Sequence, residues 1–179
     1  MRARSVGGPP AGATVHCVRL EGVDQPYLQR PQPLPLQDLS VYEALGGHTL
    51  RRHVFTKPGD ELRRIREEGV AAAGRFLSLP AAQRSVAQAI SMRRSDVLAW
   101  LRGRDRHAPF TFVADLGRIV GHTLTWEDVR NGVRTPRATT AVRVVLRRSA
   151  QLPGGFLVLT AYPTRVPQRR SNGSFGRGE

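Results

Sequence analysis

Residues 140–163, TAVRVVLRRSAQLPGGFLVLTAYP, decide the fold that the sequence predicts. Two runs, TAVRVVLRR and GFLVLTAY, alternate or nearly alternate in polarity and are rich in Val, Thr and Phe, as strands are. The Pro-Gly-Gly sequence at 153–155 is typical of a turn, so the two runs should form a hairpin. FTFVADL, which begins at Phe110, has the same pattern and predicts a further strand.

Before Gly103 the apolar residues follow a helical period instead. Five helices are expected. The first is short and begins with a capping box of Ser40 and Glu43, the second runs from His48 or Thr49 to Val54, and the third has Asp60 as N-cap. The fourth has Pro80 in its first turn and buries Val86, Ala89 and Ile90, and the fifth ends at Gly103. Helices first and antiparallel strands afterwards predict an α+β domain, with N-terminal helices packed on a C-terminal antiparallel sheet.

The two ends of the chain differ from this middle part. Proline recurs too often in residues 1–36 for a helix or an inner strand, so we expect a Pro/Gly-rich linker or leader without fixed structure. Residues 167–179 are polar, Gly-rich and basic and predict a flexible tail, which places the compact domain at 37–166. The start has no apolar segment of a secretory signal, and the sequence contains no membrane span. Cys17, the single cysteine, excludes an intramolecular disulfide and a cysteine-based metal site.

The charge of the chain points to a polyanionic partner. The 28 basic and 14 acidic residues give a formal net charge of +14. Nucleic acid is the commonest partner of so basic a protein. Nearly all the basic residues are arginines, however, as a GC-rich genome would also produce, and Lys57 is the single lysine. The charge therefore favours a nucleic-acid partner without establishing one.

GGHTLRRHV at 46–54 holds the first candidate site residues. His48 and His53 are five apart, not the four that would place two zinc ligands on one helix face, so we expect no metal site. Phosphate-loop and serine-hydrolase patterns are also missing. His53 can move protons near neutral pH, and Arg64 on the following helix could neutralise a pentavalent phosphate.

The last strand offers hydroxyl groups. A strict period of two places Phe156, Val158, Thr160 and Tyr162 on one face, and Leu157, Leu159 and Ala161 on the other. The side chains of Thr160 and Tyr162, roughly 7 Å apart along the strand, suit phosphate oxygens or a base edge. A histidine, an arginine and hydroxyls would suffice for attack of an RNA 2′-OH on its neighbouring phosphate. From these patterns alone, an ordinary basic and solvated face stays open.

GGHTLRRHV, ELRRI, AWL, VRVVLRR and GFLVLTAYP, in this order and spacing, resemble the ribonuclease toxin domain of bacterial contact-dependent growth inhibition proteins. That family is the disulfide-free relative of pancreatic-type ribonucleases, and the resemblance covers about residues 37–164. It implies an RNase A-like fold and a metal-independent endoribonuclease without cofactor. It also implies delivery into the cytoplasm of competitor cells as part of a larger surface toxin, and a cognate immunity protein.

The resemblance also implies site residues. Its catalytic histidine, arginine and Thr-x-Tyr pair fall on His53, Arg64, Thr160 and Tyr162. His48 matches a position expected to shape the site or bind substrate; Arg52 and Arg63 are further expected substrate-binding residues, and a slip from Arg64 to Arg63 stays open. The chain departs from the family at Gly74-Arg75, where a small hydroxyl residue is common. It departs again at 121–140, where we expect an extended polar loop with His122 as a substrate contact or an exposed loop histidine.

These observations lead to one hypothesis and its alternatives. In the leading hypothesis, the chain cuts RNA to a 2′,3′-cyclic phosphate, and tRNA is one candidate substrate. His53 acts as general base or acid, Tyr162 is the candidate for the second proton-transfer group, and Arg64 stabilises the phosphorane. A monomer and an acidic immunity protein are expected with it. The alternative is a non-catalytic basic nucleic-acid-binding module. An ADP-ribosyltransferase is disfavoured, because no glutamate lies between Glu127 and Glu179.

Overall fold

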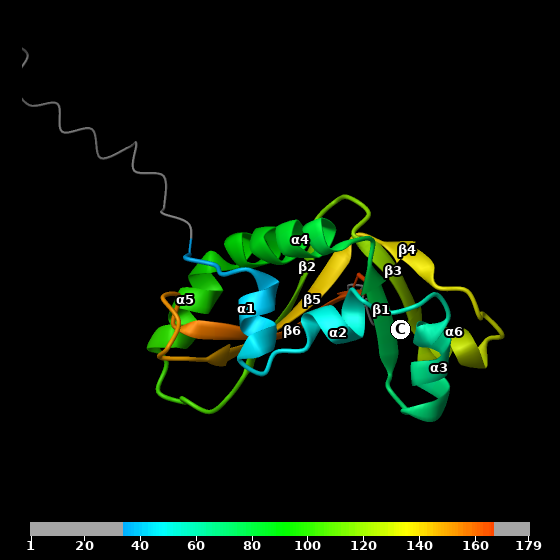
Figure 1. The fold of residues 1–179 in the computed structure, drawn as a ribbon, viewed down its shortest axis with the longest axis horizontal. Coiled ribbons are helices and arrows are strands. Elements are labelled where there is room, and N and C mark those ends of the chain that lie inside the picture. Colours follow the sequence, from blue (N-terminus) through cyan, green and yellow to red (C-terminus); the bar gives the residue numbers. More distant parts are fainter. Residues whose placement is uncertain (1–33, 167–179) are drawn as a thin grey trace, which may run out of the picture. The chain divides into compact units, whose positions relative to one another are not determined.

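The computed structural model describes residues 34–166. The tail expected at 167–179 and all but the last three residues of the expected linker lie outside the described residues. The elements are α1 (Leu39–Ala44), α2 (Thr49–His53), α3 (Asp60–Glu67), β1 (Ala72–Phe76), α4 (Leu79–Met92), α5 (Arg94–Arg102), β2 (Phe110–Asp115), β3 (Gly121–Thr125), α6 (Trp126–Arg130), β4 (Arg137–Thr139), β5 (Ala141–Arg148) and β6 (Phe156–Thr164) (Figure 1). The α+β class is confirmed. None of the described helices is long and apolar enough to cross a bilayer.

The strands form two antiparallel three-stranded sheets, in the orders β2-β5-β6 and β1-β3-β4. The predicted hairpin is confirmed as β5 and β6, whose ends pair Arg148 with Phe156. Two expectations were wrong. A strand, β1, precedes α4, and residues 121–140 form β3, α6 and β4 instead of an extended loop. The strands β1 and β3 are short, and they are stabilised by pairing with each other, which no local period reveals.

A β-bulge divides the last strand. Consecutive residues Val145 and Leu146 of β5 pair with Thr160 and Val158, so Leu159 is an extra residue without a partner in the ladder. A bulge shifts the alternation of side chains by one residue. Val158 therefore shares the buried face of Leu146, whereas Thr160 lies on the opposite face with Val145. The prediction that Phe156, Val158, Thr160 and Tyr162 share one face was wrong, because it assumed an unbroken period of two.

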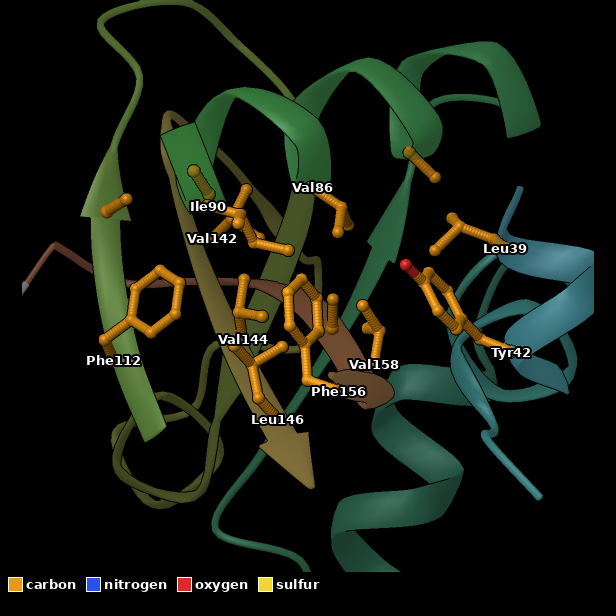
Figure 2. Close-up of a cluster of buried hydrophobic side chains, with 14 of the residues drawn as sticks. Leu39, Tyr42, Val86, Ile90, Phe112, Val142, Val144, Leu146, Phe156 and Val158 are labelled. Atoms are coloured by element: carbon orange, nitrogen blue, oxygen red, sulfur yellow. The ribbon is translucent and has the colours of Figure 1, made fainter. Parts of the chain in front are cut away.

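The main core lies between α4 and one face of β2-β5-β6, and Figure 2 shows Val86 and Ile90 of α4 facing Val142 and Val144 of β5. Val86, Ala89 and Ile90 are buried as predicted, Ser78 caps α4, and Pro80 lies in its first turn. A smaller core of Ile65, Ala73 and Leu124 lies beneath α3. Leu34 and Leu36, at the end of the expected linker, also pack against the main core.

Two helix starts differ from the sequence-based expectation. The N-cap of α1 is Asp38, with no side-chain cap, so the predicted capping box of Ser40 and Glu43 was wrong. The Glu43 carboxylate instead accepts hydrogen bonds from the N–H groups of Leu50 and Arg51, at 3.0 and 3.3 Å, in the first turn of α2. The N-cap of α3 is Gly59, which has φ of +94°, and not Asp60. Asp60 accepts from Lys57 N–H and closes the preceding turn.

Candidate active site

Hydrogen bonds to β6 and to α1 fix the start of helix α2. His48 N–H donates to Leu159 O at 2.9 Å, which gives the carbonyl of the bulged residue a partner. Ala161 N–H donates to the buried hydroxyl of Thr49 at 2.9 Å. Glu43 satisfies two further N–H groups of the first turn. In Figure 1 α2 lies beside both β6 and β1, so its last residue, His53, reaches the point where the two sheets meet.

The His53 imidazole is held from two sides. Its Nδ1 lies 2.7 Å from Gly74 O of β1, and its ring stacks on the Tyr162 ring of β6, with centroids 4.9 Å apart and an interplanar angle of 23°. A carbonyl oxygen can only accept, so Nδ1 carries the proton and Nε2 keeps its lone pair. The side chain is only 4% exposed. This arrangement fixes the tautomer and leaves Nε2 as the acceptor nitrogen of the ring.

Burial lowers the pKa of His53 to about 3, against the opposing effect of the Gly74 hydrogen bond. The positive charge of Arg64, together with His48 and Arg52, lowers it further. Burial also lowers the pKa of His48, with help from Arg52 and Arg51. Both imidazoles are therefore neutral at pH 7 in the absence of an anion, and the negative charge of an entering phosphate would favour their protonation.

The two adjacent arginines of α3 have different surroundings. The Arg64 side chain is 9% exposed; its Nη1 donates to the Arg52 carbonyl at 3.1 Å, and its Nε contacts Glu68 at 3.4 Å. The Arg63 side chain is 49% exposed and forms ion pairs with Asp60, Glu67 and Glu68 at 3.5–3.7 Å. Arg64 therefore faces α2 and the His53 site, whereas Arg63 belongs to the outer charged face of α3.

The Thr-x-Tyr pair lies on the face of β6 that the bulge turns away from the main core. Thr160 is 9% exposed, and its hydroxyl oxygen is buried without a hydrogen-bond partner among the described residues. A buried hydroxyl without a partner is unfavourable by about 1–3 kcal/mol, so this position calls for an explanation beyond packing. Tyr162 is half-buried under His53. Thr160 and Tyr162 are two residues apart on one face, as the sequence predicted.

The other candidate residues lie around this centre or apart from it. His48 is half-buried at the start of α2, and Arg52 is exposed one residue before His53. His122 lies in β3, not in a loop, opposite Arg75 of β1. An open cavity of about 810 Å³, lined in part by Arg137 and Arg165, lies on β3 and β4 and includes none of the predicted catalytic residues. Within residues 34–166, no three His, Cys, Asp or Glu side chains gather as metal ligands.

Sequence reasoning missed the role of Gly74. The departure from the family at Gly74-Arg75 concerns side chains, but the group that holds His53 is the Gly74 carbonyl. A Cβ atom at this position would clash with the backbone oxygen of Pro163. The close approach of β1 to β6 therefore requires glycine. The only signal in the sequence is a glycine inside a short apolar run.

Arg75 and Glu61 form a second feature that the sequence did not indicate. Arg75 Nε donates to Glu61 Oε1 at 3.0 Å, and the Glu61 carboxylate is only 3% exposed. Glu61 lies one turn before Arg64 on α3. This ion pair therefore ties α3 to β1, next to Gly74, whose carbonyl holds His53. We assign it a structural role in fixing α3.

Most of the described chain is similar to known proteins. The sequence model of one family, the bacterial CdiA-CT RNAse A domain, matches residues 47–163. The fold is similar to the crystal structure of a CdiA-CT/CdiI complex from Y. kristensenii 33638, with a TM-score of 0.58 and 22% sequence identity over 66% of this chain and 99% of that chain. No curated protein matches the chain.

Proposed function

The chain belongs to the family of bacterial CdiA-CT RNase A domains, ribonuclease toxin domains of contact-dependent growth inhibition, and from this we propose that it cleaves RNA by transphosphorylation at the His53–Tyr162 site. The stack of the two rings at 4.9 Å, with Nε2 of His53 left as an acceptor, is the observation that carries the proposal. It supports a proton acceptor and a hydroxyl donor side by side, both within reach of one phosphate.

The reaction that fits these groups uses no protein nucleophile. Nε2 of neutral His53 takes the proton of the ribose 2′-OH, and the 2′-oxygen attacks the adjacent phosphorus. The bond from phosphorus to the 5′-oxygen breaks, and the Tyr162 phenol supplies the proton to that oxygen. The products are a 2′,3′-cyclic phosphate and a 5′-hydroxyl end. The proton on His53 returns through water to Tyr162, which restores both groups.

Arg64 and Thr160 supply the charge and the positioning. The Arg64 guanidinium donates one N–H to the Arg52 carbonyl and its Nε–H to Glu68. Its remaining N–H groups are available to the non-bridging oxygens of the phosphorane. The Thr160 hydroxyl, which has no partner of its own among residues 34–166, is available to a phosphate oxygen. His48 and Arg52 add positive potential at the entrance, and Arg63 contributes at longer range to substrate binding.

The proposal extends to the partners and the place of action. The similar solved structure is a complex of a CdiA-CT with CdiI, which supports a protein inhibitor for this domain as well. An inhibitor with an acidic surface would cover the His53–Tyr162 site by charge complementarity. We propose that the domain acts as a monomer in the target-cell cytoplasm after delivery by a larger surface toxin. Structured RNA such as tRNA is the substrate that we would test first.

A chimeric oligonucleotide tests the mechanism. A single 2′-deoxy nucleotide placed before the cleaved bond removes the attacking group and should abolish cleavage there, while an all-ribose control is cut. Mass spectrometry should find the 2′,3′-cyclic phosphate on the all-ribose product. Cleavage of the 2′-deoxy bond would rule out transphosphorylation. If the chain binds both oligonucleotides and cuts neither, it is a nucleic-acid-binding module.

A further inference from the structure

The register of the main sheet places one arginine beside the proposed catalytic tyrosine. Arg143 of β5 pairs directly with Tyr162 of β6, and on its other side with Val113 of β2. Directly opposite residues of antiparallel strands have Cα atoms about 4.5–5.5 Å apart and present their side chains on the same face. Arg143 is therefore the side-chain neighbour of Tyr162 across the sheet.

This face of β2 and β5 is open. The core side chains Phe112, Val142 and Val144 all point toward α4 (Figure 2), and α4 is the one helix of the described chain that packs closely on β2 and β5. The opposite face presents two half-buried residues, Val113 and Val145, and three exposed ones, Thr111, Arg143 and Arg147. The Thr160–Tyr162 pair thus continues into an open strip of two half-buried valines and two arginines.

The Arg143 guanidinium has no carboxylate to neutralise it within residues 34–166. Asp115, two residues after Val113 on the same face, accepts instead from Gly117 N–H and is held by the Thr140 hydroxyl. Other exposed arginines, such as Arg63, are tied into ion pairs. An exposed guanidinium that extends from a rigid strand is preorganised for an anion, and its planar fork matches two phosphate oxygens.

We propose that Arg143 binds the phosphate of the RNA chain next to the cleaved phosphate. Val113 and Val145 form the floor beneath the nucleotide that links these two phosphates. This inference rests on the proposed function, because it takes the His53–Tyr162 site as the place of cleavage. Arg143 belongs to substrate binding and does not touch the reacting atoms. The bulge at Leu159 is essential, since it brings Thr160 and Tyr162 onto the face of Arg143.

Binding of an RNA that cannot be cleaved tests this assignment. The variants are Arg143→Ala and, as a control of equal charge change, Arg84→Ala, because Arg84 is exposed on α4 against the other face of the sheet. A 2′-O-methyl tetranucleotide is titrated by fluorescence anisotropy. We expect Arg143→Ala to weaken binding about 5- to 10-fold and to reduce the slope of log K against log salt by about 0.7, as loss of one single-strand phosphate contact requires. Arg84→Ala should change binding less than about 2-fold, because its charge is remote and screened.

Cleavage assays locate the contact. On an all-ribose tetranucleotide, Arg143→Ala should lower kcat/KM about 10-fold, whereas on a dinucleotide with one phosphate it should change kcat/KM less than about 2-fold. Equal behaviour of the two arginine variants on the tetranucleotide would overturn the proposal, as would an equal loss on the dinucleotide. If the wild type binds the tetranucleotide through Arg143 but cuts no RNA, the proposed cleavage fails while the phosphate contact stands.

Discussion

The rings of His53 and Tyr162 stack at 4.9 Å, although one residue ends the second helix and the other lies in the last strand. The contact is possible because the start of α2 is hydrogen-bonded along β6 at Leu159 and Ala161, the residues on either side of Thr160. The bulge at Leu159 then presents Tyr162 to His53 and away from the main core. Proton transfer and substrate binding in the proposed reaction both depend on this local arrangement.

Acid should destabilise the protein through His53. Its pKa of about 3 in the folded state, caused mainly by burial, lies below the usual value of about 6.5, so the unfolded state binds the proton first. The stability contributed by neutral His53 is fully present above about pH 6.5 and is lost as the pH falls toward 3. Between pH 7 and pH 5 we expect a loss of about 2 kcal/mol in the free energy of unfolding, measured with urea.

The control for this prediction is His53→Asn. The Asn amide can still donate to Gly74 O but does not titrate. The difference between wild type and variant therefore isolates His53 from His48, whose pKa burial also lowers. It also isolates His53 from Asp60, whose pKa the hydrogen bond from Lys57 N–H lowers. The same pH dependence in both proteins would show that His53 is not held neutral by burial.

Substitution of Arg64 should lower RNA cleavage much more than substitution of Arg63, although the two residues are adjacent. Arg64 faces the His53 site, whereas Arg63 is engaged with carboxylates on the outer face of α3. We expect Arg64→Ala to lower kcat/KM for RNA about 100- to 1,000-fold, as loss of a group that stabilises transition-state charge does. Arg63→Ala should lower it less than about 3-fold, through long-range attraction alone. A larger loss from Arg63→Ala than from Arg64→Ala would move the catalytic role to Arg63.

Thr160→Val should separate stability from activity. The substitution keeps the shape of the side chain and removes a buried hydroxyl that has no partner among the described residues. We therefore expect the free energy of unfolding to stay unchanged or to rise by about 1 kcal/mol, while kcat/KM falls about 10-fold. Urea unfolding and RNA cleavage measure the two quantities. A variant that is less stable but fully active would show that the hydroxyl serves the fold.

Gly74→Ala should destabilise the junction of the two sheets. The added Cβ would meet the backbone oxygen of Pro163, which cannot move without shifting β6. We expect a loss of at least about 3 kcal/mol in the free energy of unfolding, because neither strand can give way. The control is Gly69→Ala, where the Cβ has free space and only the φ of +67° is strained. That variant should lose about 1–2 kcal/mol. Equal losses would contradict the close approach of β1 and β6.

Some elements could be predicted from the sequence because their signals are local. Helix α4 combines a serine cap, a proline in the first turn and a regular apolar period, and the β5–β6 hairpin combines alternation with a Pro-Gly-Gly turn. The bulge at Leu159 could not be predicted, since it depends on how α2 and β5 bind the two sides of β6. Strand β1 is five residues long, and its sequence has no alternating pattern that would predict a strand. It is stabilised by pairing with β3.

The site divides in the same way. The residues His53, Arg64, Thr160 and Tyr162 were selected from motifs, and the structure places His53 against Tyr162 and directs Arg64 toward α2. The Gly74 carbonyl could not be found from side-chain patterns, because the group that fixes the tautomer belongs to the backbone. The Arg143–Tyr162 neighbour pair likewise depends on the register, which the bulge determines.

The most direct test of the account is cleavage of total tRNA and rRNA by the purified domain in excess EDTA. The wild type is compared with His53→Asn and Tyr162→Phe, each first shown by urea unfolding to be folded at pH 7. We predict that the wild type cuts RNA with the chelator present and that both variants lose at least about 100-fold in rate, as removal of a general base or acid does. Undiminished cleavage by folded His53→Asn would contradict the central role of the His53–Tyr162 site.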